Sequence, residues 1–482
     1  MKKLKDRKTK MIDKDTVFTW FKGCTDVVIE NTMKDDDLLL YCKTLVDKKE
    51  LRYHIIPRLE QLTDVENNEQ TDALLTQSLK LDDSISDQII QKVFEGNLII
   101  VSFSRDCVFS IEADQIPHRS VEQPITESTI KGARDGFVEE LETNLGLIRK
   151  RIKTTSLKIK RFVIGKRNKT KLALLFLDDV IPTHIIHDIS KRLDQIDTDG
   201  IVSSSQIEEL LHANKPQIFP LLDYSGRPDY AMNCLLYGRF VILVDGSPTA
   251  IMGPVSLPFL LNAGEDQHVG FFFGSFERLV RYLGLIASLL LPGFWIALIT
   301  HHPDQLPYTL LATYSLTRQG IPFPPILEGF LILLLFDLLR EAGLRLPAAF
   351  GQTLSIVGGL IIGQASISAG IASPGIIVVV AISVISTFVI INQALVGAVN
   401  VIRIFIYLAS ALMGLVGFFS TLFFLIIYLV NLKSFQLPYL TPISPPYFTS
   451  MIPSFFRSRF KKMNKRPREL QTIDSTRRRK QE

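Results

Sequence analysis

The sequence lacks the signatures of the common enzyme and nucleotide-binding classes. It contains no G-x-x-x-x-G-K-[ST] phosphate loop, no strand-linked G-x-G-x-x-G, no H-E-x-x-H zinc motif and no G-x-S-x-G nucleophile turn. The carboxylates Asp178 and Asp179 are adjacent, and adjacent side chains of a strand point to opposite faces, which disfavours a catalytic pair. We therefore expect no enzymatic activity, no cofactor and no metal.

Cysteine is scarce. The four cysteines, Cys24, Cys42, Cys107 and Cys234, include no C-x-x-C pair and have no histidine pattern beside them. This spacing disfavours a disulfide framework or a zinc site and is typical of reduced cytoplasmic thiols. The charged N-terminus is not followed by an apolar core, so it does not indicate a cleavable signal peptide. The large N-terminal region is expected to be cytoplasmic.

Charge is missing from one long stretch, because residues 346–402 contain no Lys, Arg, Asp or Glu. Up to about residue 275 polar and apolar segments alternate as in a soluble protein, whereas residues 279–432 are apolar enough to predict membrane spans. Residues 456–482 carry eleven Lys or Arg against three acids, a net of +8 that leaves about −3 for the rest of a chain of net charge +5. The positive net charge of the whole chain comes from this tail and therefore does not indicate a nucleic-acid partner.

Two cytoplasmic α/β subdomains are predicted ahead of the apolar region, over residues 1–124 and 125–265. In the first, the runs 97–103 and 106–111 predict a strand pair. In the second, Asp245-Gly246-Ser247-Pro248 lies between two apolar runs, which predicts a hairpin turn and not a phosphate loop. Further elements of the second subdomain are a helix that ends in the basic cluster 149–153, strands at 158–164, 171–176 and 239–244, and helices at 183–196 and 205–212.

An all-α polytopic transmembrane domain is predicted over residues 266–445. An interfacial helix at 266–281 turns into a first span at 282–300. Later apolar segments are 321–339, 351–371, 376–395 and 404–432. The last is longer than one span requires, so it is tilted, projects from the bilayer, or is broken near Gly414 and Gly417.

The number of crossings is four or five. Five spans place Arg340, Arg345 and Arg403 inside, as the positive-inside rule requires, but leave the basic tail, residues 446–482, outside. If residues 322–339 form a broken or re-entrant segment, the tail returns to the cytoplasm. We expect an even number of membrane crossings, because the tail carries more positive charge than the three arginines.

Ionisable residues interrupt the apolar run that begins near residue 322, and they are Glu328, Asp337, Arg340, Glu341 and Arg345. A charge inside a bilayer costs about 2.5 kcal/mol or more, so such residues remain where protein or water surrounds them. On a helix, Asp337, Arg340 and Glu341 share one face within reach of mutual pairing, and Glu328 is nearly opposite. Two interpretations stay open: a solvated helix end at the membrane surface, and a buried functional network.

Residues 351–370 interleave glycines with glutamines and serines. Gly359 and Gly363 form a small-xxx-small pair, which lets helix backbones approach closely. Close packing within a bundle and the lining of a pore both explain this pattern. In the pore interpretation, the stripe consists of Gln352, Ser355, Gly359, Ile362 and Ser366. Ile362 is then the apolar constriction that gates by dewetting.

Several blocks resemble the A subunit of the GerA family of bacterial spore germinant receptors. They are ITESTIKGARDGFVEELETNLGLIRKRI at 125–152, SGRPDYAMNCLLYGRFVILVDGSPTAIMGPVSL at 225–257, residues 321–380, and SFQLPYLTP at 434–442. The resemblance covers about residues 120–445. The chain departs from the family pattern at Lys131-Gly132-Ala133, where Arg-Gly-Pro is expected, and at Gln436, where a glycine is expected.

This resemblance implies a multi-pass protein of the spore inner membrane with a cytoplasmic N-terminal domain. Its implied partners are a transporter-like B subunit, which binds the nutrient, and a lipoprotein C subunit. The A subunit is implied to form a homo-oligomeric ring whose helices make a nutrient-gated ion channel that triggers germination. Two alternatives stay open: a transporter that uses Glu328 and Asp337 as coupling carboxylates, and a non-conducting scaffold subunit.

Overall fold

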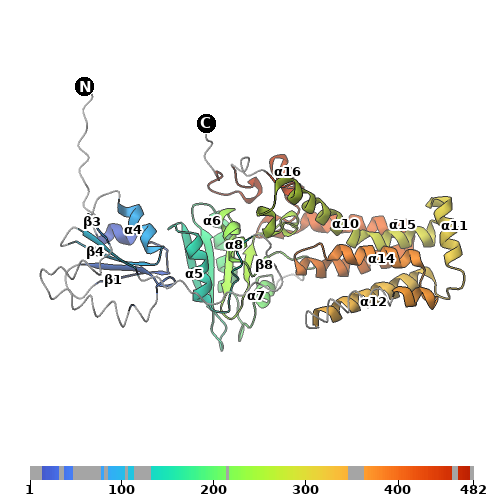
Figure 1. The fold of residues 1–482 in the computed structure, drawn as a ribbon, viewed down its shortest axis with the longest axis horizontal. Helices are drawn as coiled ribbons and strands as arrows, with labels where there is room; N and C mark the ends of the chain where they lie inside the picture. The colour runs from blue at the N-terminus through green and yellow to red at the C-terminus, as the bar shows by residue number, and fades with distance from the viewer. Residues whose placement is uncertain are drawn as a thin grey trace, which may run out of the picture. The chain divides into compact units, whose positions relative to one another are not determined.

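The structure is a computed structural model that describes residues 14–31, 37–46, 51, 77–80, 85–103, 107–112, 132–212, 217–345, 363–458 and 465–477. The chain divides into two compact units (Figure 1). The first, here the α/β unit, comprises residues 1–216, 222–254 and 463–482. The second, here the helical unit, comprises residues 217–221 and 255–462.

The first subdomain of the α/β unit is an antiparallel sheet of order β1-β2-β4-β5-β3. Its elements are α1 (Lys14–Trp20), β1 (Val27–Asn31), β2 (Leu38–Cys42), β3 (Gln77–Lys80), α4 (Ile85–Val93), β4 (Asn97–Ser102) and β5 (Cys107–Glu112). Apolar side chains of α1 and α4 pack on one face of this sheet and form its core. The predicted strand pair is confirmed, because β4 and β5 pair with Asn97 opposite Glu112.

The second subdomain is an antiparallel sheet of order β6-β7-β9-β10-β8 with helices packed on it. Its elements are α5 (Leu141–Arg151), β6 (Leu157–Ile164), β7 (Thr170–Leu177), α6 (Thr183–Asp194), α7 (Ser204–Leu211), β8 (Asp223–Ser225), α8 (Pro228–Leu236), β9 (Phe240–Val244) and β10 (Ala250–Gly253). The predicted hairpin turn joins β9 to β10, and Gly246 has a φ of +83°, which L side chains rarely adopt. The short elements β8 and α8 were not predicted.

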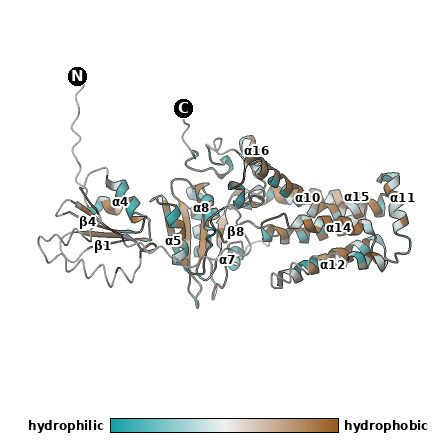
Figure 2. Cartoon of the chain, viewed as in Figure 1, coloured by the Kyte–Doolittle hydropathy of each residue, from teal (hydrophilic) through white to brown (hydrophobic). Residues whose placement is uncertain are grey.

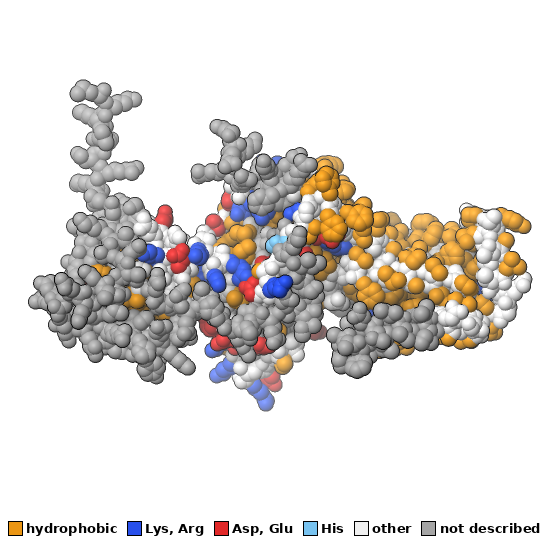
Figure 3. Space-filling model, viewed as in Figure 1, with side chains coloured by type: hydrophobic (Ala, Val, Ile, Leu, Met, Phe, Trp, Pro, Cys, Tyr) orange, Lys and Arg blue, Asp and Glu red, His pale blue; other side chains and the backbone are white. Residues whose placement is uncertain are grey.

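The helical unit consists mainly of long apolar helices. Its elements are α9 (Leu257–Leu260), η2 (Gly264–Gln267), α10 (Phe271–His301), η3 (Pro303–Gln305), α11 (Tyr308–Thr317), α12 (Pro325–Arg345), α14 (Pro374–Thr387), α15 (Gln393–Asn431), β11 (Lys433–Ser434), β12 (Leu437–Pro438) and α16 (Phe448–Phe455). In the described residues, α10 and α15 are long and apolar enough to cross a membrane. Figure 2 colours these helices largely as hydrophobic, and Figure 3 shows hydrophobic side chains over them and charged side chains over the described part of the α/β unit.

The helices of this unit depart from two expected boundaries and agree with one. α10 is continuous from Phe271 to His301, so no break separates an interfacial helix at 266–281 from the first expected span. α12 is an unbroken helix of 21 residues that packs on α14 and α10, so the segment is not broken within Pro325–Arg345, and a re-entrant path for it stays a prediction. Of the three alternatives for the last apolar segment, the break near Gly414 agrees with the structure, where φ is 62° and ψ is −142°.

The basic C-terminal segment docks on the second subdomain of the α/β unit. Arg466 Nε donates to the carbonyl oxygen of Leu236, at the end of α8, at 2.8 Å. Ile473 N donates to Val180 O at 2.9 Å, and Leu470, in the short helix η5 (Arg468–Leu470), is 2% exposed. Arg477 donates to the Tyr237 hydroxyl and stacks on its ring at 4.5 Å. The described part of the tail is therefore a structural part of this subdomain.

Candidate functional site in the helical unit

The centre of the helical unit is an ion pair between two helices. Arg403, on α15, is 0% exposed, and its Nη2 donates to both carboxylate oxygens of Asp337, on α12, at 2.8 and 2.9 Å. Both oxygens of the carboxylate are thereby satisfied by one guanidinium nitrogen. A buried pair of this kind adds little net stability, but removing one partner leaves an uncompensated buried charge.

The same guanidinium reaches the two remaining long helices. Arg403 Nη1 lies 3.5 Å from the Ser383 hydroxyl on α14, and that hydroxyl donates to Ser288 O on α10 at 2.9 Å. Ser288 and Ser383 are both 0% exposed. A continuous polar path therefore joins α10, α12, α14 and α15 inside an otherwise apolar unit, and it specifies their relative position.

A second contact joins α12 to α15 one helical turn away. With its side-chain oxygen turned toward α12, the Asn400 amide accepts a hydrogen bond from Arg340 Nη1 at 2.7 Å. Asp337 contacts Arg403, whereas Arg340, three residues later on α12, contacts Asn400, three residues earlier on α15. The two helices therefore run antiparallel. The sequence placed Asp337 and Arg340 within reach of each other, but each binds α15 instead. The buried guanidinium of Arg403 supplies a stronger interaction than a pair on one helix surface.

Glu328 lies at the other end of α12. Its side chain is 0% exposed, and its Oε1 accepts a hydrogen bond from the backbone N–H of Ser373. The neighbouring residue, Gly329, lies against the Tyr407 hydroxyl, which donates to Ile326 O at 2.8 Å. Glu328 is therefore a protein-enclosed carboxylate and not part of a solvated helix end.

The other predicted site residues are only partly described. Glu341 is exposed on α12, and the Arg345 side chain lies outside the described residues. Of the pore-lining stripe, Ser366 is 6% exposed, and its carbonyl oxygen accepts hydrogen bonds from the N–H groups of residues 371 and 372. The other four stripe residues, Gln352, Ser355, Gly359 and Ile362, lie outside the described residues.

Arg403 was not identified as a site residue from the sequence, although a signal was present. It is the only Lys, Arg, Asp or Glu between residues 346 and 432. A single charge in such a run requires a buried partner, and Asp337 was the carboxylate already known to interrupt an apolar helix. Ser288, Ser383 and Asn400 carried no such signal, because small polar residues are common in apolar helices that pack closely.

A second buried ion pair holds the two subdomains of the α/β unit together. Arg149, at the end of α5, donates from Nε to Asp26 Oδ2 at 2.7 Å and from Nη2 to Asp26 Oδ1 at 2.9 Å. Both side chains are 0% exposed, and the guanidinium stacks on Phe94 of the first subdomain at 4.4 Å. The Cys42 thiol donates to Asp26 Oδ2, and burial, followed by the charge of Asp26, raises the pKa of this thiol to about 12. The thiol therefore stays protonated as a donor.

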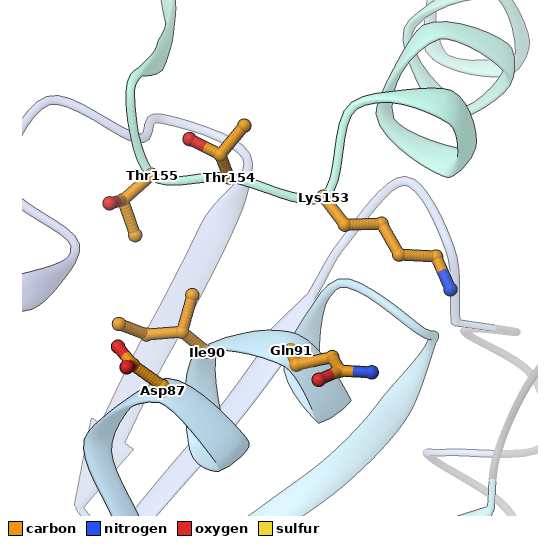
Figure 4. A pocket seen from close by; sticks show the side chains of 6 residues that line it. All are labelled: Asp87, Ile90, Gln91, Lys153, Thr154 and Thr155. Carbon is orange, nitrogen blue, oxygen red and sulfur yellow. The ribbon is translucent and has the colours of Figure 1, made fainter. Parts of the chain in front are cut away.

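A pocket of about 500 Å³ lies beside this joint (Figure 4). It is lined by Asp87, Ile90 and Gln91 of α4 and by Lys153, Thr154 and Thr155 of the segment after α5. These residues supply a carboxylate, an amide, an amine and two hydroxyl groups, which are polar groups able to bind a ligand. Within the described residues, no group of three or more His, Cys, Asp or Glu side chains is placed to hold a metal ion.

These features define a protein of two units. The Arg149–Asp26 ion pair joins the two α/β subdomains, and the Arg403–Asp337 ion pair joins helices of the apolar helical unit. A family model described as Bacillus/Clostridium GerA spore germination protein matches residues 15–469. The chain belongs to the GerA family of spore germination proteins, as its sequence blocks indicated.

Two relatives in sequence agree with this assignment. The chain is 49% identical over 487 residues to spore germination protein XA of Bacillus anthracis, with 98% of each chain covered. It is 31% identical to spore germination protein KA of Bacillus subtilis, with 91% of this chain and 81% of that one covered. The crystal structure of the N-terminal domain of the A subunit of the Bacillus megaterium spore germinant receptor GerK3 has a TM-score of 0.38 and 21% identity, covering 51% of this chain and 96% of that one.

Proposed function

We propose that this chain is the A subunit of a nutrient receptor of bacterial spores and that it acts in the spore inner membrane. The observation that carries the proposal is the family match over residues 15–469, together with a relative named as a spore germination protein that covers 98% of the chain. A transporter-like B subunit and a lipoprotein C subunit are its proposed partners, and the α/β unit is proposed to be cytoplasmic.

Membrane insertion is supported by the dimensions and surface of the helical unit. α10 has 31 residues, which at about 1.5 Å per residue is about 46 Å and exceeds the roughly 30 Å of a bilayer core. Large apolar side chains are exposed on α14 and α15, with Ile385 62%, Phe405 62% and Phe424 66% exposed. Surfaces of this kind are unfavourable in water and suit contact with lipid or with other subunits.

An even number of crossings is supported by chain connectivity. The chain leaves the α/β unit after residue 254 and rejoins it at residue 463. A chain that leaves a soluble unit, enters a membrane and returns to the same unit crosses an even number of times. This favours the expected cytoplasmic tail without requiring a break in α12.

We extend the proposal to conduction by a ring of identical subunits, in which Gln352, Ser355, Gly359 and Ile362 line the pore and Ile362 closes it. Ser366 is 6% exposed and is therefore buried within its own subunit, so it is left out of the proposed lining. Its support is the uncharged, glycine-rich pattern of residues 346–402. The buried Asp337–Arg403 pair holds the surrounding helices in place. No covalent chemistry is proposed for any residue.

The test is complementation of a spore-forming host that lacks its own nutrient receptors. The chain is expressed with its two partner subunits, and the release of monovalent cations from spores is recorded after addition of amino acids or sugars. Nutrient-dependent release that requires this chain supports the receptor proposal, and its absence with all three subunits present contradicts it. Unitary conductance steps from the purified complex in a planar bilayer separate a channel from a transporter or scaffold.

A further inference from the structure

Glu328 is a buried carboxylate with one oxygen that lacks a partner. Its Oε1 accepts the Ser373 N–H, whereas its Oε2 is buried without a hydrogen-bond partner among the described residues. Arg318, at the end of α11, donates to Phe323 O at 2.9 Å and forms no ion pair with Glu328 in the described part of the chain. A negative charge enclosed in this way is unfavourable unless a positive charge or a proton neutralises it.

Two more oxygen atoms without partners lie in the same region. The Ser373 and Tyr314 hydroxyls are buried, with their residues 0% and 8% exposed, and neither has a hydrogen-bond partner in the described residues. Because the Ser373 N–H binds Oε1, covalent geometry keeps the Ser373 hydroxyl within about 6 Å of the carboxylate. Tyr314 lies within electrostatic range of both Glu328 and Arg318, and the Arg318 guanidinium lies 5.8 Å from the centre of the Tyr314 ring. Tyr314 also packs in one core cluster with Ile376. Unpartnered oxygens therefore come from α11, α12 and the segment that precedes α14.

We propose that Glu328 Oε2, Ser373 Oγ and the Tyr314 hydroxyl oxygen bind one monovalent inorganic cation. Carboxylate and hydroxyl oxygens are the ligands that hard cations prefer, and a cation satisfies all three without requiring any of them to donate a proton. A single carboxylate balances a single positive charge, whereas a divalent ion would leave one charge buried. The proposal goes beyond the proposed function, because it holds whether or not the chain conducts ions.

Binding at this position links three consecutive elements. Tyr314 is on α11, Glu328 is in the first turn of α12, and Ser373 is the N-cap residue of α14. A ligand that binds only the folded arrangement stabilises it by mass action, and the stabilisation grows with the concentration of the ion. The site therefore predicts a stability that depends on the identity of the monovalent cation and not only on ionic strength.

The test uses the full chain purified in detergent. Its melting temperature is measured in sodium chloride, potassium chloride and choline chloride at matched ionic strength, and bound ²²Na⁺ and ⁸⁶Rb⁺ are counted by equilibrium dialysis. We expect the melting temperature to rise saturably with Na⁺ or K⁺ relative to choline, with one ion bound per chain. Glu328→Gln, which keeps the shape and removes the charge, abolishes both signals. Glu341→Gln, which removes an exposed charge from the same helix, keeps both.

Three results would overturn the proposal: a wild-type melting temperature that is equal in all three salts, a Glu328→Gln response equal to that of wild type, or an absence of bound ion. A Glu328→Gln protein that is more stable than wild type in every salt also overturns it, because it indicates a protonated carboxyl. If the Glu328→Gln protein does not accumulate, the Ser373→Ala variant is used for the same measurements. Because it removes one of the three oxygen ligands, we expect the Na⁺ or K⁺ concentration that gives half of the maximal effect to rise by about tenfold. If that concentration is the same in Ser373→Ala and in wild type, the proposed site is wrong.

Discussion

Arg403 and Asp337 are 66 residues apart in the chain, and a guanidinium nitrogen of the first binds both oxygens of the second. This pair, extended through Ser383 to Ser288, is the polar contact that all four long helices of the helical unit share. Its position explains why Asp337 and Arg403 interrupt apolar helices in this chain. These two residues are structural partners of each other and not isolated charges.

Asp337→Asn is expected to destabilise the helical unit, because it leaves the Arg403 guanidinium at 0% exposure without a counter-charge. Breaking a fully buried pair by removing one partner costs about 3 to 5 kcal/mol, and because the Asp337 side chain is 22% exposed, the expected cost is at or below the lower end of that range. The measurement is the thermal unfolding of the full chain in detergent, with Glu341→Gln as the matched control on the exposed part of the same helix.

The double variant Asp337→Leu/Arg403→Leu separates the buried charge from packing. Replacing both partners by apolar groups removes the uncompensated charge, so the double variant is expected to be more stable than Asp337→Asn. A double variant that is less stable than Asp337→Asn would show that shape at this position matters more than charge.

Local patterns in the sequence predicted most of the second subdomain, because its strands are apolar runs bounded by turn residues. The strands β6, β7 and β9 and the Asp-Gly turn agree with those patterns. β8 and α8 were missed, because one has only three residues and the other begins at a proline in a short segment with no clear period. The joint between Arg149 and Asp26 was also missed, because a pair 123 residues apart leaves no local pattern.

Only the residues that α12 contributes to the site in the helical unit were predicted from the sequence. Periodicity placed Asp337 and Arg340 on one face of α12, but it carried no information about Arg403 and Asn400 on α15, which contact them. The tail was predicted to be basic, but its docking was not predicted. That docking depends on backbone carbonyl oxygens such as Leu236 O, which leave no pattern in a sequence.

Leu470→Ala is expected to release the tail from the α/β unit. Leu470 is 2% exposed, and truncating a buried leucine costs about 2 kcal/mol or more. Tryptic cleavage after Lys465 and Arg468 requires local opening, so it should become about 30-fold faster. Ile473→Ala is the matched control in the same tail, because Ile473 is 60% exposed. Equal cleavage rates in the two variants would mean that the tail is not held by this contact.

Glu208→Gln is expected to stabilise the α/β unit at high pH only. Burial, followed by the charge of Asp223, raises the pKa of Glu208 from its ordinary value of 4.5 to about 7. The folded state therefore binds the proton more tightly than the unfolded state, so its stability falls as the pH rises from about 4.5 to about 7. The glutamine variant should exceed wild type by roughly 1 to 3 kcal/mol at pH 8 and match it below pH 4.5.

The measurement for Glu208 is a series of thermal unfolding curves of wild type and variant across this pH range. Glu209→Gln is the neighbouring control on α7, because its side chain is exposed. A difference between Glu208→Gln and wild type that does not change with pH would rule out titration of this carboxyl as its cause.

Ile362→Ala tests the proposed gate. An apolar ring that closes a pore by dewetting loses its barrier when the side chain shrinks, since a wider and less apolar constriction admits water. Spores with this variant are expected to leak monovalent cations and to germinate without nutrient, while the receptor stays at its normal abundance. Ile367→Ala, which truncates a side chain that is 37% exposed at the end of the same run, is the control. Normal dormancy and a normal nutrient response in Ile362→Ala spores would place the constriction elsewhere and remove this stripe from the pore, because a gate residue cannot be truncated without changing the closed state.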